Sequence, residues 1–199
     1  AMLDNSNLEV TMKCRVGIDN LTSYDFFRDF IDVTTQSGIR IVYVHARDAI
    51  LNGLSPKNNR TVPPLKYEFV SRINKDFPKI QFIVNGGINN LNQAYKFCKK
   101  YDGVMVGRLI QSNPFCLLDV DKKIFDETGN NKEYKNIVIE YFNYVKEKID
   151  QDSIFRLLSP ILYIFFGIPN GKKNKAKVHQ KLNDCRIDEL ETMFLQYIG

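Results

Sequence analysis

Four short apolar runs, separated by segments of helical periodicity, constrain the fold of this chain more than any other feature. The runs cover residues 10–13, 41–44, 80–84 and 103–106, and a helical pattern follows each of the first three. Strands of this kind, joined by crossover helices, pair in parallel through right-handed connections. The sequence therefore predicts one sheet of four parallel strands that alternate with helices.

Each apolar run ends next to polar residues or glycine. These residues are Lys13, His45, Asn85-Gly86-Gly87 and Gly107-Arg108. In an α/β barrel the carboxyl ends of the strands carry the active site, so such residues indicate a ligand-facing edge. Four strands make half of an eight-stranded barrel, and we therefore predict half of a TIM (β/α)8 barrel.

The pattern becomes all-helical from about residue 119. We predict helices at residues 133–149, 154–166, 172–182 and 187–197, the second of them kinked at Pro160. The predicted fold class is therefore α/β plus all-α. The predicted domains are an α/β domain at 1–118 and a helical domain at 119–199.

The glycine-containing strand ends are typical of phosphate sites in barrels. Glycine lets backbone N–H groups approach an anion, and Arg108 could hold two oxygens at once. The alternative is that these glycines only make tight strand-to-helix turns. Lys13 and His45 add a cation and a titratable donor, which would suit a flavin. The alternatives are a solvated strand end for Lys13 and a core histidine for His45.

Two basic stretches favour a polyanionic partner, in keeping with the formal net charge of +5. The loop at 46–65 carries Arg47, Lys57 and Arg60. A predicted helix carries Lys172, Lys173 and Lys175, and no acidic residue occurs between 171 and 183. Contact with RNA phosphates is one interpretation. A solubilising loop and a solvated helix face are the alternative.

Cysteine spacing and hydropathy bear on the compartment. Cys14, Cys98, Cys116 and Cys185 are far apart and form no CxxC pair, so we expect neither a metal site nor a disulfide framework. No signal peptide is predicted. The most apolar segment, at 154–168, is shorter than the ~20 residues of a membrane span. We expect no membrane partner and a cytoplasmic location, with an organelle as the open alternative.

Several longer motifs occur in a defined order along the chain. They are Val10-Thr11-Met12-Lys13-Cys14-Arg15-Val16-Gly17-Ile18-Asp19, His45-Ala46-Arg47, the Gly-Leu-Ser-Pro-Lys-x-Asn-Arg-x-x-Pro-Pro-Leu loop, Asn85-Gly86-Gly87-Ile88, and Asp102-Gly103-Val104-Met105-Val106-Gly107-Arg108 with Asn113-Pro114. Together these motifs resemble one family, the tRNA-dihydrouridine synthases. The loop after His45 most resembles the branch that acts on D-loop uridines 20 and 20a. The similarity is dense from about residue 10 to 118 and thinner beyond.

The resemblance implies the C-terminal half of an FMN-binding TIM barrel followed by a tRNA-binding helical domain. It implies an oxidoreductase that reduces uridine to 5,6-dihydrouridine in tRNA, with FMN as cofactor and NADPH as reductant. Lys13 and His45 would contact the flavin ring and ribityl region. The phosphate of FMN would be held by Asn85, Gly86, Gly87, Gly107 and Arg108.

Two departures from the family pattern matter. The proton-donor cysteine of the family lies in an Asn-x-x-Cys-Pro loop, which does not occur here, and neither Cys14 nor Cys116 should inherit its role. We therefore expect a C-terminal portion of a longer enzyme, inactive alone, whose open strand edges favour self-association. The second departure is Asp48-Ala49-Ile50, where the resemblance predicts a basic residue and a tryptophan.

Two other functions are compatible with this sequence. One is another FMN-dependent barrel dehydrogenase that acts on a free pyrimidine or on dihydroorotate. The other is an RNA-binding module without flavin chemistry. Basic residues in the loop at 46–65 and in the helical tail favour the tRNA enzyme over the first, and bound flavin would separate it from the second.

Overall fold

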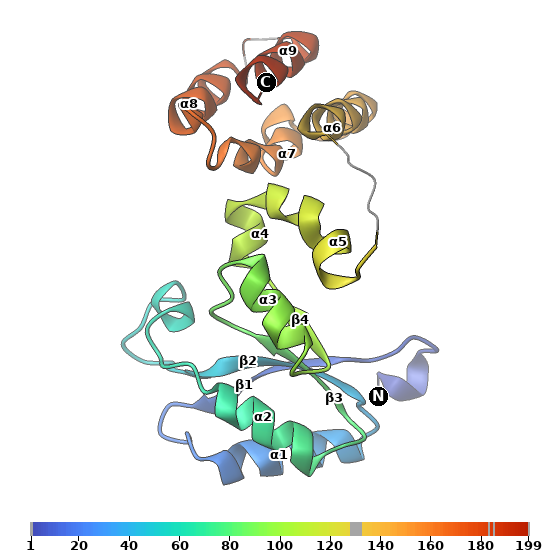
Figure 1. Cartoon of the computed structure of the whole chain (residues 1–199), viewed down its shortest axis with the longest axis vertical. Coiled ribbons are helices and arrows are strands. Elements are labelled where there is room, and N and C mark those ends of the chain that lie inside the picture. Colours follow the sequence, from blue (N-terminus) through green and yellow to red (C-terminus); the bar gives the residue numbers. More distant parts are fainter. Residues whose placement is uncertain (1, 128–132, 183, 185, 199) are drawn as a thin grey trace. The chain divides into compact units, whose positions relative to one another are not determined.

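The computed structural model describes residues 2–127, 133–182, 184 and 186–198. The chain divides into two compact units, residues 1–106 and 107–199, coloured blue to green and green to red in Figure 1. The division falls earlier than the predicted boundary at 118. The physical reason is that Phe115 packs against the core of the helical unit, and Gln111 donates a hydrogen bond to Tyr163 of the same unit.

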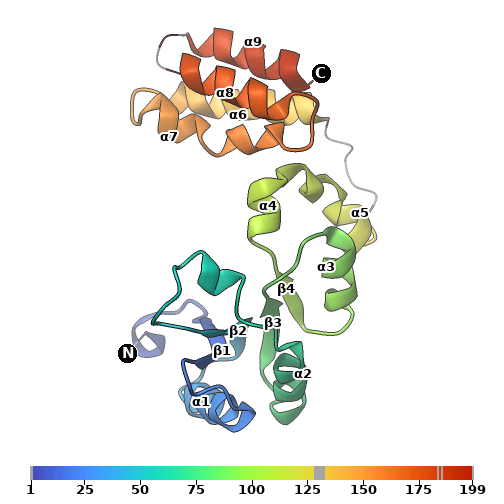
Figure 2. The same cartoon turned by 90° about the vertical axis from the view of Figure 1, so that its left-hand side faces the viewer.

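Unit 1 contains the four predicted strands, all parallel and in the order β1-β2-β3-β4 (Figure 2). The strands are β1 (Met12–Ile18), β2 (Ile41–Ala49), β3 (Gln81–Asn85) and β4 (Gly103–Met105). Together with their crossover helices they form part of an α/β barrel, which confirms the predicted fold class.

The first two strands are longer than predicted. Residues 15–18 and 46–49, which lie beyond the predicted runs, continue the β1–β2 ladder, in which Gly17 pairs with Asp48 and Ile18 with Ala49. The ladder has an irregularity between Arg15 and Gly17. Because these strand ends contain polar residues, the local sequence pattern did not indicate strands there. The strand with which each end pairs lies some thirty residues away in the sequence.

Three helices cover one side of the sheet, as Figure 2 shows: α1 (Tyr24–Gln36), α2 (Tyr67–Asp76) and α3 (Leu91–Cys98). Ser23 and Asn90 cap α1 and α3 by accepting hydrogen bonds from the backbone N–H of Phe26 and Gln93. The core lies between helices and sheet. Its fully buried members include Phe27, Ile31, Val42, Val44, Val70, Ile73, Phe82 and Val84.

Unit 2 is helical, as predicted. Its elements are α4 (Arg108–Ser112), the 3-10 helix η3 (Pro114–Asp119), α5 (Val120–Ile124), α6 (Tyr134–Lys148), α7 (Ile154–Leu158), the 3-10 helix η4 (Ile161–Phe165), α8 (Gly171–Lys181) and α9 (Ile187–Ile198). The prediction of one kinked helix at 154–166 was wrong. The helix ends before Pro160, because the proline nitrogen has no hydrogen to donate to the backbone hydrogen bond that a continuous helix needs.

Unit 1 also contains the short 3-10 helices η1 (Leu3–Asn5) and η2 (Asn58–Arg60).

Candidate functional site

Strand register brings Lys13, His45 and Asn85 to one face of the sheet. Lys13 pairs with Tyr43, and His45 pairs with Asn85 on β3. Side chains alternate along a strand, so these residues point away from the face where Val42 and Val44 pack under the helices. Three predicted ligand-binding residues therefore share the face that the helices leave open.

Lys13 and Asn85 also contact each other. The exposed ammonium of Lys13 donates to Asn85 Oδ1 at 3.4 Å, and Asn85 Nδ2 donates to the carbonyl of Met105 at 2.7 Å. His45 is only 8% exposed. The site thus combines an exposed cation, an amide held by β4, and a nearly buried imidazole.

The glycine turn after β3 packs directly on His45. Gly86 has φ +109°, and a Cβ there would lie 2.6 Å from His45 Cδ2. Gly87 has φ +66°, and the hydroxyl of Tyr67 donates to the carbonyl of Gly86 at 2.5 Å. Both glycines are therefore required by the turn itself. This supports the tight-turn explanation, and phosphate binding by Asn85, Gly86 and Gly87 stays a prediction.

Gly107 and Arg108 begin unit 2. Gly107 is the N-cap of α4, has φ −132°, and has open space where a Cβ would lie. Unlike Gly86, it is not required by local packing. Arg108 is exposed at the first position of α4. Their contact with a cofactor phosphate also stays a prediction.

Arg15 and Arg47 tie the loop after β2 to the strand ends. Arg15 donates to the carbonyls of Asp48 and Asn59, both at 2.8 Å, and Arg47, 8% exposed, donates to the carbonyl of Pro63. Burial lowers the pKa of Arg15, and the nearby charges of Arg47 and Arg60 lower it further. Positive charge therefore gathers at these strand ends.

The predicted RNA-contacting residues of this loop differ in how exposed their side chains are. Lys57 and Arg60 are exposed at η2, whereas the burial of Arg47 gives no support to its predicted RNA contact. Sequence reasoning did not single out Arg15. Arg15 lies two residues after Lys13. Since strand residues i and i+2 share a face, this spacing indicates that Arg15 lies on the same face as Lys13.

Asp48 forms an ion pair with Lys66 on the helix-facing side of the sheet. Lys66 Nζ lies 2.7 Å from Asp48 Oδ2, and the two side chains are 17% and 9% exposed. Lys66 also donates to the carbonyl of Thr22 at 2.9 Å. The acidic residue that departs from the family pattern thus joins the end of β2 to the start of α2.

Replacing Lys66 by methionine should lower the free energy of unfolding by about 3 kcal/mol, because it leaves the Asp48 carboxylate buried without its partner. Chemical denaturation followed by circular dichroism measures this. The matched control is Lys75→Met, the same change at an exposed position of α2. Adding Asp48→Asn to Lys66→Met should recover part of the loss. Equal stability of the two lysine variants would contradict the assigned role.

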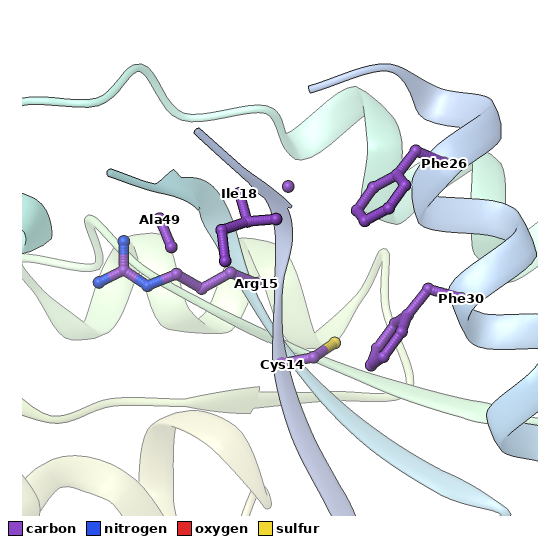
Figure 3. Close-up of a pocket in the computed structure, with 7 residues that line it drawn as sticks. Cys14, Arg15, Ile18, Phe26, Phe30 and Ala49 are labelled. Carbon is purple, nitrogen blue, oxygen red and sulfur yellow. The ribbon is translucent and has the colours of Figure 1, made fainter. Parts of the chain in front are cut away.

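An apolar pocket of about 320 Å³ lies beside β1, at one end of the strand order (Figure 3). Cys14, Ile18, Phe26 and Phe30 are among the residues that line it. Figure 3 shows Cys14 and Arg15 pointing to opposite sides of the strand. Burial raises the pKa of the Cys14 thiol to about 12. Cys14 is thus neither on the Lys13 face nor readily ionised, in keeping with its exclusion as proton donor.

The remaining cysteines lie elsewhere. Cys98 is exposed on α3, Cys116 is half-buried in η3, and Cys185 lies outside the described residues. Burial raises the pKa of both the Cys98 and the Cys116 thiols. Within the described ranges, no cluster of three or more His, Cys, Asp or Glu residues could hold a metal ion. No helix in those ranges is both long and apolar enough for a membrane crossing.

The predicted basic helix of unit 2 is α8. Lys172 and Lys173 are exposed in its first turn, and Lys175 is half-buried with Nζ 4.3 Å from the ring centre of Tyr163. All three lie within four residues of the helix start. Their predicted contact with RNA is compatible with this placement and stays a prediction.

Comparisons with a family model and with individual proteins both indicate the same family. The model of the dihydrouridine synthase family matches residues 1–196. A tRNA-dihydrouridine(20/20a) synthase of Salmonella typhimurium is 38% identical over 190 residues, covering 94% of this chain and 57% of the relative. Proteins of the same description from Yersinia pestis and Synechocystis are 38% and 37% identical, over 87% and 86% of this chain and 51% and 52% of their own length. The chain spans about half the length of these curated relatives.

Proposed function

This chain belongs to the dihydrouridine synthase family, and from that premise we propose that it is the C-terminal part of an enzyme that reduces uridine to 5,6-dihydrouridine in tRNA. The proposed cofactor is FMN and the proposed reductant is NADPH. Positions 20 and 20a are the proposed target, since the names of the relatives specify these two positions.

The observation that carries the proposal is the shared face of Lys13, His45 and Asn85. Its residues fit a flavin, because Lys13 can offset negative charge on the reduced ring and His45 can donate a hydrogen bond. When bound, FMN supplies hydride transfer. Asn85 orients Lys13 through their 3.4 Å contact. The packing of Gly86 against the imidazole holds His45 in place.

Lysine and arginine side chains of both units would position the RNA. Lys57 and Arg60 in unit 1, and Lys172, Lys173 and Lys175 in unit 2, can neutralise phosphates without reading sequence. The target uracil must leave its stack, because a ring buried in a folded RNA cannot be reached on its face. Cys14 lies on the opposite side of β1, so the proton for the reduced base would come from a residue in the missing half.

The pocket beside β1 is where that missing half would pack. The sheet order leaves one side of β1 without a neighbouring strand among the described residues. Phe30 is 43% exposed there, and the pocket is mainly apolar. A parallel strand preceding this chain would pair with the free side of β1, and its helix would cover Phe30 and the pocket. Without them, we propose that the exposed edge promotes self-association.

The proposal is tested by joining this chain to the preceding half of the Salmonella typhimurium relative. We expect the chimera to retain flavin through gel filtration and to form dihydrouridine in unmodified tRNA with NADPH, whereas the chain alone does neither. Lys13→Ala in the chimera should weaken flavin retention, and Lys75→Ala, at an exposed position of α2, should not.

Other outcomes identify other functions. A chimera that oxidises dihydroorotate or reduces free uracil, but leaves tRNA unchanged, would support the small-molecule dehydrogenase. A folded chimera that binds tRNA without flavin would support an RNA-binding module. Stoichiometric flavin on the chain alone would contradict the idea that half of the flavin site lies elsewhere.

A further inference from the structure

Helix α8 packs beside the α7–η4 segment of unit 2 (Figure 2), and basic side chains of α8 face aromatic side chains of that segment. The Phe155 ring lies 5.4 Å from the His179 ring, edge to face, and Lys175 Nζ lies 4.3 Å from the Tyr163 ring. Phe166 and Lys172 end the series and line the same cavities. We call these six residues the aromatic–basic row.

Two adjoining cavities, of about 250 and 520 Å³, meet at the Phe166 end of the row. They share Phe165, Phe166, Gly171 and Lys172. Phe165 is buried and packs on Phe194, whereas Phe166 is 54% exposed. The cavities therefore present the accessible Phe166 ring beside lysine side chains.

The backbone around Phe166 is shaped to turn that ring outward. Gly167 has φ +75°, and a Cβ on Gly171 would overlap the carbonyl oxygen of Phe165. The start of α8 is thus pressed against the chain that carries Phe166, which brings Lys172 and Lys173 to the cavity rim. Neither glycine can be replaced without moving this rim.

The charge of the rim selects the class of ligand. No acidic residue occurs between 171 and 183, so lysines provide the charge that α8 brings to the cavities. An apolar cavity with an exposed ring and a cationic edge suits a ligand with a flat face and a negative group. A nucleotide has both, since its base stacks on an aromatic ring and its phosphate binds lysine.

We propose that these cavities form a single-nucleotide subsite for tRNA, in which a base stacks on Phe166 and the adjacent phosphate binds Lys172 and Lys173. The subsite rests on the proposed function, because it assumes that the chain acts on tRNA. It goes further by assigning one unpaired nucleotide to a defined ring. Stacking tolerates any base, so the subsite holds the RNA without selecting its sequence.

The absence of tryptophan from the sequence allows a direct test of stacking. Phe166→Trp gives the full chain a single tryptophan whose fluorescence reports a base on its face. Short oligouridylate should quench it, and inorganic polyphosphate, which has charge without bases, should not. Phe125→Trp is the matched control, because Phe125 is also exposed in unit 2 but lies outside both cavities.

Titration of the full chain with unmodified tRNA tests the energetics. Phe166→Ala should weaken binding about tenfold, the effect expected of one lost stacking contact, and Phe125→Ala should not. Lys172→Gln should reduce the slope of log affinity against log salt by about one, as expected for one lost phosphate contact. Lys181→Gln, the same charge change at the other end of α8, should alter the slope less.

The outcomes separate the subsite from the proposed function. Quenching of Phe166→Trp by oligouridylate alone supports the subsite, whatever the chimera does in the reduction assay. Tight tRNA binding by the wild-type chain without selective quenching overturns the subsite and leaves the proposed function standing. If the wild-type chain binds neither tRNA nor oligouridylate, the subsite is overturned together with the RNA-binding role of unit 2.

Discussion

Replacing Phe142 by alanine should lower the free energy of unfolding of unit 2 by about 3–5 kcal/mol, the range for losing a buried phenylalanine. Phe142 is completely buried on α6, and its ring lies 5.2 Å from that of Phe194 on α9. Phe194 also packs against Phe165 at 5.0 Å. The substitution removes one ring of this aromatic cluster and leaves a cavity in the core of unit 2.

Chemical denaturation of the full chain, followed by far-UV circular dichroism, measures the loss. The matched control is Phe125→Ala, the same substitution at a residue of unit 2 that is 63% exposed, and it should change stability by less than about 0.5 kcal/mol. A Phe142→Ala variant as stable as this control would mean that α6 does not pack as described. The result also bears on the nucleotide subsite, since Phe165 lines its cavities.

Cys14 should react with iodoacetamide at least about 100-fold more slowly in the folded chain than in the denatured chain at pH 8, because thiolate is the reactive form. Burial raises the pKa of its thiol from 9.0 to about 12, and Lys13 opposes this rise only in part. Three pH units correspond to roughly a thousandfold smaller thiolate fraction at a pH below both values.

Mass spectrometry of peptides after timed alkylation resolves the individual cysteines. Cys98, which is exposed on α3, is the internal reference and should be alkylated well before Cys14. The rate at Cys14 should rise about tenfold per pH unit up to its pKa. Alkylation of Cys14 as fast as Cys98 at pH 8 would show that the pocket beside β1 admits solvent freely.

The same shift predicts how stability depends on pH. In the folded chain the thiol keeps its proton up to about pH 12, whereas the unfolded chain releases it from about pH 9. Between these values the folded state binds more protons, so stability falls as pH rises. Below pH 9 the contribution of Cys14 is complete and constant. Removing the thiol with Cys14→Ala should flatten the alkaline part of the stability profile.

Packing of the proposed preceding half against β1 would change both measurements at Cys14. In the chimera, a strand beside β1 would cover the pocket that Cys14 shares with Phe26 and Phe30. Alkylation of Cys14 should then slow further, while that of Cys98 stays the same. This gives a structural readout of barrel completion that does not depend on flavin or on activity.

Local sequence patterns predicted most of the elements. Helical periodicity between the apolar runs indicated the crossover helices, and the runs themselves located the four strands, although not the full length of β1 and β2. Lys13, His45 and Asn85 were also predicted as ligand-binding residues, because each lies at the end of such a run. These features depend on neighbours within about one turn of helix or a few strand residues.

Contacts between distant segments could not be predicted in the same way. The extension of β2 to Ala49, the Asp48–Lys66 ion pair and the contacts of Arg15 with Asp48 and Asn59 each join residues from different elements. The earlier unit boundary, at Val106, depends on Phe115 packing into a core formed by residues beyond 133.

The chain's alternation of apolar and polar residues was thus sufficient to set the order of strands and helices and to put Lys13, His45 and Asn85 at strand ends. Strand register then decided that these three side chains share the face away from the helices, that Cys14 points to the other side, and that Arg47 is buried. The packing of α8 on η4 decided that Phe166 is exposed beside Lys172. The physical reason is that periodicity is a property of consecutive residues, whereas register and burial depend on which distant residues meet.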